Sequence, residues 1–332
     1  MKNFNLILTA LLALPASSSA QFGDLDEKVI YGLDSRKEYF QVQPEIRVLA
    51  DSVASLWSEN DLEALPNGSF RLTAGKFSEM NVNGGKVCAN EPYRDQPAGA
   101  GCSASLVGED LLLTAGHCVS SQAQCDRLRI VFGFNISVIG GEAPTTFPAS
   151  DVFFCKEIVK SAFESSDGEM ATDRDFSVIR LKRKVEGRSP LRLNRAGGLA
   201  KNDPVFVIGH PMGLPVKIAD DATVVKLDEK ALFFEANLDT YGRNSGSPVF
   251  NGRTNLIEGV LVRGNKDFNR SPEGCMLSNV VPQNIDDGED VTKTSVFAEF
   301  VTPTAEEAAA GPVPVDSSSI TVAPSGRSFS FD

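Results

Sequence analysis

The chain has 332 residues, of which 42% are hydrophobic and 23% are charged, an ordinary composition for a globular protein with a sizeable core. Its 44 acidic residues outnumber its 32 basic residues, which gives a formal net charge of −12. An acidic chain repels phosphate backbones, so this balance excludes nucleic acid as an expected partner.

Residues 1–20 have the pattern of a secretory signal peptide. Lys2 precedes an apolar stretch from Leu6 to Leu14, and small residues precede a cleavage point after Ala20. The stretch is too short to span a bilayer comfortably. A buried N-terminal helix is the alternative, but the segment has neither a cap nor an amphipathic period. Because no later stretch is long and apolar enough to cross a bilayer, we expect a secreted or periplasmic protein with no membrane anchor.

The next segments predict a short propeptide and then a helix. Residues 21–28 are polar and acidic, without periodicity, and a more structured run begins at Val29. Within residues 44–57, the apolar positions 46, 49, 53 and 56 follow a helical spacing, and Pro44 suits a first turn. We therefore expect a propeptide over 21–28 and a helix over 44–57.

From Cys102 onward the pattern changes to short apolar runs that are separated by Gly, Pro, Asn and Asp. The runs cover residues 105–107, 111–113, 129–134, 152–154, 176–181, 204–208, 231–234 and 256–262. Many short strands at this spacing favour an all-β sandwich or a pair of barrels over a βαβ fold. We expect one domain over residues 29–303.

The C-terminal residues 304–332 are rich in Pro, Ala, Ser and Thr. Such a composition cannot bury enough apolar surface to fold alone. We therefore expect this segment to be a flexible tail.

Six cysteines fit an exported chain, because an even count in that compartment indicates disulfides. They are Cys88, Cys102, Cys118, Cys125, Cys155 and Cys275. The sequence by itself leaves the connectivity open. A metal site is poorly supported, since no CxxC pair occurs and the only two histidines lie far apart. We expect no metal and no cofactor.

Two segments carry the residue types of a nucleophilic serine site. His117 ends the run TAGHC after an apolar strand, and Ser245 lies between glycines in GRNSGSPVF. Glycines allow a tight backbone path that can point successive N–H groups at one spot, as an oxyanion hole requires. The alternatives are a hydrogen-bonded core histidine and a polar hairpin turn.

Together, TAGHC and GxNSGSPV resemble the chymotrypsin-family serine proteases. The bacterial branch that includes the glutamyl endopeptidases is most similar, with Asn before the nucleophile and Ser after the following Gly. The resemblance implies two packed antiparallel β-barrels with the active site in the cleft between them. It assigns His117, Asp175 and Ser245 as the catalytic triad, in the family order. Asp175 opens the strand DFSVIRL, whereas Asp173 is the alternative, a loop carboxylate.

The resemblance also implies a disulfide between Cys102 and Cys118, which closes the loop behind the catalytic histidine. A pair of Cys125 with Cys155 is a weaker expectation, since both adjoin apolar strands. Cys88 with Cys275 follows by elimination.

The family pattern places the oxyanion hole at the N–H groups of Arg243 and Ser245. Arg243 stands where the family usually has Gly, and a side chain there resists a left-handed backbone. Asn244 replaces the Asp with which digestive members pair their new N-terminus. Because Asn244 carries no charge, it cannot form this ion pair with a new N-terminus. We therefore expect cleavage after Lys28 to change activity less sharply than in the digestive enzymes, and the uncut precursor to keep measurable activity.

The same resemblance assigns the residues of the primary specificity pocket by their positions relative to the nucleophile. Asp239, six residues before the nucleophile, would lie at the base of the pocket with Thr240 beside it. A carboxylate there favours a substrate Arg or Lys. Leu261 stands where the glutamyl branch has a His, whereas Arg263, near the pocket wall, could neutralise Asp239 or attract an acidic substrate. Alternatively, Asp239 only caps a turn.

The sequence thus predicts a secreted, monomeric serine endopeptidase that acts on protein or peptide substrates, with cleavage after Arg or Lys favoured. A catalytically inactive binding module of the same fold is the alternative, supported only by Arg243. A lipase or esterase is disfavoured, because the strand-to-helix elbow is missing. His210, in GHPMGLP, is expected to have a packing role.

Overall fold

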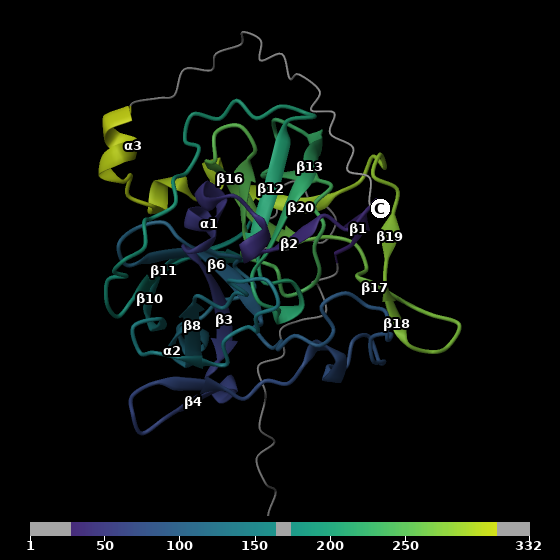
Figure 1. Cartoon of the computed structure of the whole chain (residues 1–332). Helices are drawn as coiled ribbons and strands as arrows, with labels where there is room; N and C mark the ends of the chain where they lie inside the picture. The colour runs from purple at the N-terminus through teal and green to yellow at the C-terminus, as the bar shows by residue number, and fades with distance from the viewer. Residues whose placement is uncertain (1–27, 164–173, 311–332) are drawn as a thin grey trace, which may run out of the picture.

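The computed structural model describes residues 28–163 and 174–310 (Figure 1). The signal peptide, most of the propeptide, Asp173 and residues 311–332 lie outside this part of the chain. Within it, no helix is both long and apolar enough to cross a bilayer.

Six antiparallel strands form a closed first barrel in the order β10-β11-β7-β6-β3-β8. The strands are β3 (Val53–Ser58), β6 (Cys102–Leu106), β7 (Leu111–Thr114), β8 (Leu128–Phe132), β10 (Val152–Phe163) and β11 (Asp175–Leu181). They occupy the lower half of the view in Figure 1. The short apolar runs of the sequence therefore become barrel strands.

A second group of six antiparallel strands closes in the order β12-β15-β16-β20-β14-β13, through pairing of β12 with β13. The strands are β12 (Pro204–Gly209), β13 (Lys217–Leu227), β14 (Phe233–Ala236), β15 (Pro248–Asn251), β16 (Ile257–Arg263) and β20 (Glu289–Lys293). A short strand, β2 (Arg36–Glu38), pairs with β13. The expected fold of two packed six-stranded barrels is confirmed.

Alternation along the strands divides side chains between two cores. On β12, Val205 and Val207 belong to the core inside the second barrel. Phe206 and Ile208 belong instead to the largest cluster, which also contains residues of the first barrel. Because successive side chains point to opposite faces of a strand, a run of apolar residues such as β12 fills both cores and locks the barrels together.

Smaller elements cover the barrels. The strands are β1 (Ile30–Tyr31), β4 (Leu62–Ala64), β5 (Phe70–Leu72), β9 (Thr146–Phe147), β17 (Phe268–Arg270), β18 (Met276–Ser278) and β19 (Val280–Val281). The α-helices are α1 (Pro44–Ala50), α2 (Gln122–Arg127) and α3 (Ala305–Ala310).

Two segments differ from the sequence-based expectation. The helix predicted over 44–57 stops at Ala50, and residues 53–58 form β3 instead. Strand β3 pairs with both β6 and β8, so closing the barrel outweighs the helical spacing of these residues. At the other end, the described start of the expected tail forms α3, where Glu307 accepts a hydrogen bond from the Leu193 backbone at 2.7 Å.

Candidate active site

The first barrel brings His117 and Asp175 together. Strand β7 ends three residues before His117, Asp175 begins β11, and these two strands are paired. His117 Nδ1 lies 2.7 Å from Asp175 Oδ2, and the carboxylate is almost completely buried. The backbone N–H groups of Gly116 and His117 donate to Asp175 Oδ1 at 2.6 and 3.2 Å. A carboxylate held in this way fixes the proton on Nδ1, so that Nε2 is the nitrogen that can act as a base.

Glycine is required at position 116 because strand β10 passes close by. A Cβ there would lie 2.0 Å from the carbonyl oxygen of Ala162. The Gly of the TAGHC motif therefore lets the backbone approach β10 and still reach Asp175.

Ser245 lies in the loop before β15, and this loop docks onto the first barrel. The carbonyl oxygen of Ser245 accepts a hydrogen bond from Ser103 N–H at 2.8 Å. The next residue, Gly246, has a φ of +86°, and a Cβ there would lie 2.1 Å from Ser103 O and 2.2 Å from Thr114 Oγ1. Only glycine fits this position, so the motif positions the serine at the boundary of the two barrels.

Asn244 is buried in a hydrogen-bond network that uses both ends of its amide. Its Nδ2 donates to Thr240 Oγ1 at 2.5 Å, and its Oδ1 accepts from Ser247 Oγ at 2.9 Å. An amide both donates and accepts, whereas an ionised Asp could only accept. Thr240 therefore positions the loop of the serine through Asn244.

Arg243 has a left-handed backbone conformation with a φ of +67°, although its side chain resists that conformation. For a residue with a side chain this conformation costs about 1–2 kcal/mol. The strain lies next to the serine, where the surrounding hydrogen bonds hold the loop.

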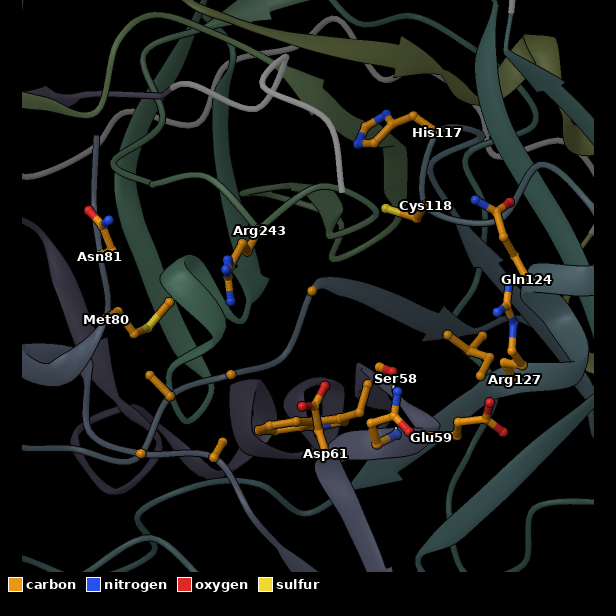
Figure 2. A pocket seen from close by; sticks show the side chains of 18 residues that line it. Ser58, Glu59, Asp61, Met80, Asn81, His117, Cys118, Gln124, Arg127 and Arg243 are labelled. Atoms are coloured by element: carbon orange, nitrogen blue, oxygen red, sulfur yellow. Dashed lines mark hydrogen bonds between the residues drawn. The ribbon is translucent and has the colours of Figure 1, made fainter. Parts of the chain in front are cut away.

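A cleft of about 540 Å³ opens beside His117 and is lined mainly by the first barrel and its loops, with Arg243 contributed by the loop before β15 (Figure 2). His117 and Cys118 of the first barrel line one part of it, and Arg243 of the second barrel lines another. Figure 2 shows the Arg243 side chain extending into the cleft, with Asp61 across from it. The loops that carry the two candidate motifs therefore meet at one cleft.

Three disulfides are present: Cys88–Cys275, Cys102–Cys118 and Cys125–Cys155. The pairing implied by the resemblance and both weaker expectations agree with the structure. Among the described residues, one group has the spacing of a metal site, namely Cys102, His117 and Cys118. Its two sulfurs are bonded to each other, so they offer no thiolate to a metal.

The two charged residues that the resemblance assigns to specificity, Asp239 and Arg263, form hydrogen bonds within the second barrel and with the N-terminal segment. Asp239 is buried, and its carboxylate oxygens accept from the backbone N–H groups of Tyr31 at 2.6 Å and Ser35 at 2.7 Å. Burial raises the pKa of Asp239 above its ordinary value, and these hydrogen bonds offset only part of the shift. Arg263 Nε donates to Asp290 Oδ2 at 3.0 Å. Asp239 thus binds the backbone of the N-terminal segment. This agrees with the alternative in which its carboxylate only caps a turn.

His210 has the packing role expected from the sequence. Its ring stacks on Phe134 at an interplanar angle of 18°, and its Nδ1 donates to Leu214 O at 2.9 Å. Burial lowers the pKa of His210 to about 3. The imidazole is therefore neutral and structural.

Sequence reasoning assigned Lys28 only as the processing site and did not assign Glu289 at all, and both residues are completely buried. Lys28 Nζ donates to Ser245 Oγ at 3.1 Å, and Glu289 Oε1 accepts from Val29 N–H at 3.2 Å. No motif marks either contact, because both join positions more than 200 residues apart. Lys28 therefore contacts Ser245 in the uncut chain, and the activity expected of the precursor stays a prediction.

Comparison with known proteins finds a family model that matches part of the chain. Residues 102–260 match the model of the trypsin-like peptidase domain. No curated protein matches the sequence significantly. The fold is similar to a solved glutamyl endopeptidase, at 18% identity and a TM-score of 0.45, over 82% of this chain and 97% of that one. It is also similar to the VesB protease of Vibrio cholerae, at 12% identity and a TM-score of 0.47, over 82% and 67% of the chains. Residues 102–260 thus match a trypsin-like peptidase domain, and the described residues form a two-barrel, chymotrypsin-like fold.

Proposed function

We propose that the protein is a secreted serine endopeptidase in which Ser245 is the nucleophile, His117 the general base and Asp175 the residue that orients His117. The observation that carries the proposal is the bond of 2.7 Å between His117 Nδ1 and the buried carboxylate of Asp175. This contact gives the imidazole the tautomer that a serine protease requires.

In the proposed reaction, His117 Nε2 takes the hydroxyl proton of Ser245 while the serine oxygen attacks the peptide carbonyl carbon. The N–H groups of Arg243 and Ser245 stabilise the resulting oxyanion. His117 then gives the proton to the leaving amine, and an acyl-enzyme remains at Ser245. Water, deprotonated by His117, hydrolyses this ester and restores the serine.

Secretion and a monomeric state are parts of the same proposal. The three disulfides support an oxidising compartment, since such bonds persist outside the cytosol. The signal-peptide pattern of residues 1–20 agrees with this location.

Labelling with a fluorophosphonate tests the proposal against an inactive binding module. The folded chain, cut after Lys28, should take one label, and Ser245→Ala should take none. Ser150→Ala is the control, because it removes an exposed serine hydroxyl outside this loop and should still be labelled. A processed, folded wild-type chain that takes no label would favour the binding module.

A further inference from the structure

The side chain of Lys28 fills a buried slot that leads away from Ser245. Its Nζ donates to Ser245 Oγ at 3.1 Å, whereas its backbone N–H donates to Asp267. A slot between Asp267 and the nucleophile is therefore as long as one lysine side chain. Lys28 enters it from the Asp267 end, and its ammonium points toward the serine.

One wall of the slot is the chain of β16 and the residue that follows it. Val262 O accepts a hydrogen bond from Ser245 Oγ at 3.1 Å. Two residues on, the Glu289 carboxylate packs against Gly264, where a Cβ would lie 1.6 Å from Glu289 Oε2. Two residues of extended chain span roughly 7 Å. Ser245 and Glu289 therefore lie at opposite ends of the slot.

The inner end of the slot is acidic. Glu289 Oε1 accepts from Val29 N–H at 3.2 Å and from the Tyr31 hydroxyl at 3.1 Å. Its Oε2 has no hydrogen-bond partner among the described residues. Asp267 lies at the same end, where both of its oxygens accept from Gly242 N–H at 3.0 Å. A buried carboxylate with an open oxygen is stabilised by a cation.

The charge of Lys28 meets this requirement in the uncut chain. Burial raises the pKa of Glu289 well above its ordinary value, and the charge of Lys28 offsets part of this shift, whereas the charge of Asp267 adds to it. Lys28 therefore stabilises the ionised carboxylate while its side chain fills the space next to the nucleophile.

Hydrolysis of the Lys28–Val29 bond would change both features. Water adds across the bond, which leaves a carboxylate on Lys28 and an ammonium group on Val29. Lys28 can then leave the slot, while the new ammonium group starts 3.2 Å from Glu289. Two carboxyl groups, those of Glu289 and Asp267, then face one ammonium group at the inner end, and a second cation there would favour ionisation of both.

We propose that the slot filled by Lys28 is the primary specificity pocket of the processed enzyme, and that Glu289, together with Asp267, selects a substrate Lys or Arg. A basic side chain that enters from the Ser245 end would reach these carboxylates, in the direction opposite to Lys28. The inference rests on the proposed serine endopeptidase function and moves the specificity role from Asp239 to Glu289.

The test uses chain cut after Lys28, with Val29 confirmed as the first residue, and peptides that differ only in the residue before the scissile bond. Wild type should cleave after Lys and Arg with a kcat/KM at least tenfold above that for Gln, and above that for Glu. Glu289→Gln should reduce the Lys-to-Gln ratio by about 10- to 100-fold, as expected for a lost charge-assisted hydrogen bond. Asp239→Asn should leave this ratio unchanged.

Fluorophosphonate labelling separates the two possible failures. If Ser245 is labelled but wild type prefers Glu or shows no preference for basic residues, the assignment of the pocket is overturned and the proposed function stands. The same holds if Asp239→Asn, and not Glu289→Gln, abolishes the preference. If neither labelling nor hydrolysis occurs, both fail. Binding of p-aminobenzamidine to Ser245→Ala gives an independent readout, which Glu289→Gln should weaken tenfold or more, and unchanged binding would contradict the proposal.

Discussion

At the scale of single residues, the candidate site depends on backbone positions that few side chains tolerate. Gly116 approaches β10, Gly246 approaches the first barrel, and Arg243 holds a left-handed conformation. Each places a backbone group beside His117 or Ser245. The cost in backbone strain is thus concentrated at the loops that would perform the chemistry.

Substitution of Gly246 by Ala should lower the free energy of unfolding by roughly 3 kcal/mol or more, because the new Cβ clashes with Ser103 and Thr114. Gly274 is a matched control, since its φ of +88° is similar but nothing lies within 4 Å of an added Cβ. Gly274→Ala should cost only about 1–2 kcal/mol. Equal losses in urea denaturation would show that close approach is not the reason for Gly246.

The sequence predicted the residues that local motifs carry, and it missed those that only tertiary contacts reveal. His117 and Ser245 stand in short glycine-containing patterns, and Asp175 opens an apolar strand. The sequence marks Lys28 only as a processing site and does not mark Glu289, because the fold alone brings Lys28 to Ser245 and Glu289 to Val29. The position of Asp239 was found by counting from Ser245, but its partners lie on the N-terminal segment and could not be predicted in that way.

At the scale of elements, strand pairing determines the secondary structure of segments whose apolar periodicity is ambiguous. Residues 53–58 have apolar positions at helical spacing, yet they form β3 because both neighbours in the barrel require a strand there. The strands after Cys102 were predicted better, since their runs are short and separated by turn residues. Disulfides then attach loops and helices to these strands.

Two disulfides of the first barrel should contribute similarly to stability but differently to activity. Cys125 and Cys155 attach α2 to β10 and are 30 residues apart, whereas Cys102 and Cys118 are 16 residues apart. Each double substitution to Ala should lower the free energy of unfolding by about 3 kcal/mol. Only the Cys102–Cys118 variant should also lose peptidase activity, because Cys118 follows His117 directly.

Thermal unfolding and peptide hydrolysis, measured below the melting temperature of both variants, check this difference. Loss of activity in the Cys125–Cys155 variant alone would contradict the assignment of the Cys102–Cys118 bond to the support of His117.

At the scale of the whole molecule, the two barrels pack against each other through a shared core. The first barrel carries His117 and Asp175, and the second carries Ser245. His210 belongs to this shared structure, since its backbone N–H donates to Ser103 Oγ of the first barrel at 2.9 Å. Its neutral, buried ring makes the contact between the barrels sensitive to acid.

His210 should make the protein less stable at low pH. Its pKa of about 3 in the folded state lies below its ordinary value of 6.5. Below pH 6.5 the unfolded chain therefore binds a proton that the folded chain does not, and stability falls as the pH approaches 3. The difference in unfolding free energy between wild type and His210→Gln should change over this range by up to about 4 kcal/mol. A difference that is independent of pH between 3 and 6.5 would contradict this role.

The central claim is that His117, Asp175 and Ser245 act as one catalytic unit. The most direct test is the hydrolysis rate of processed wild type, Ser245→Ala, His117→Ala, Asp175→Asn and the triple variant on one peptide. Ser245→Ala and His117→Ala should each lower kcat about 10⁶-fold, the triple variant no further, and Asp175→Asn about 10⁴-fold. A Ser245→Ala enzyme that keeps the wild-type rate, or losses that multiply independently, would contradict the account.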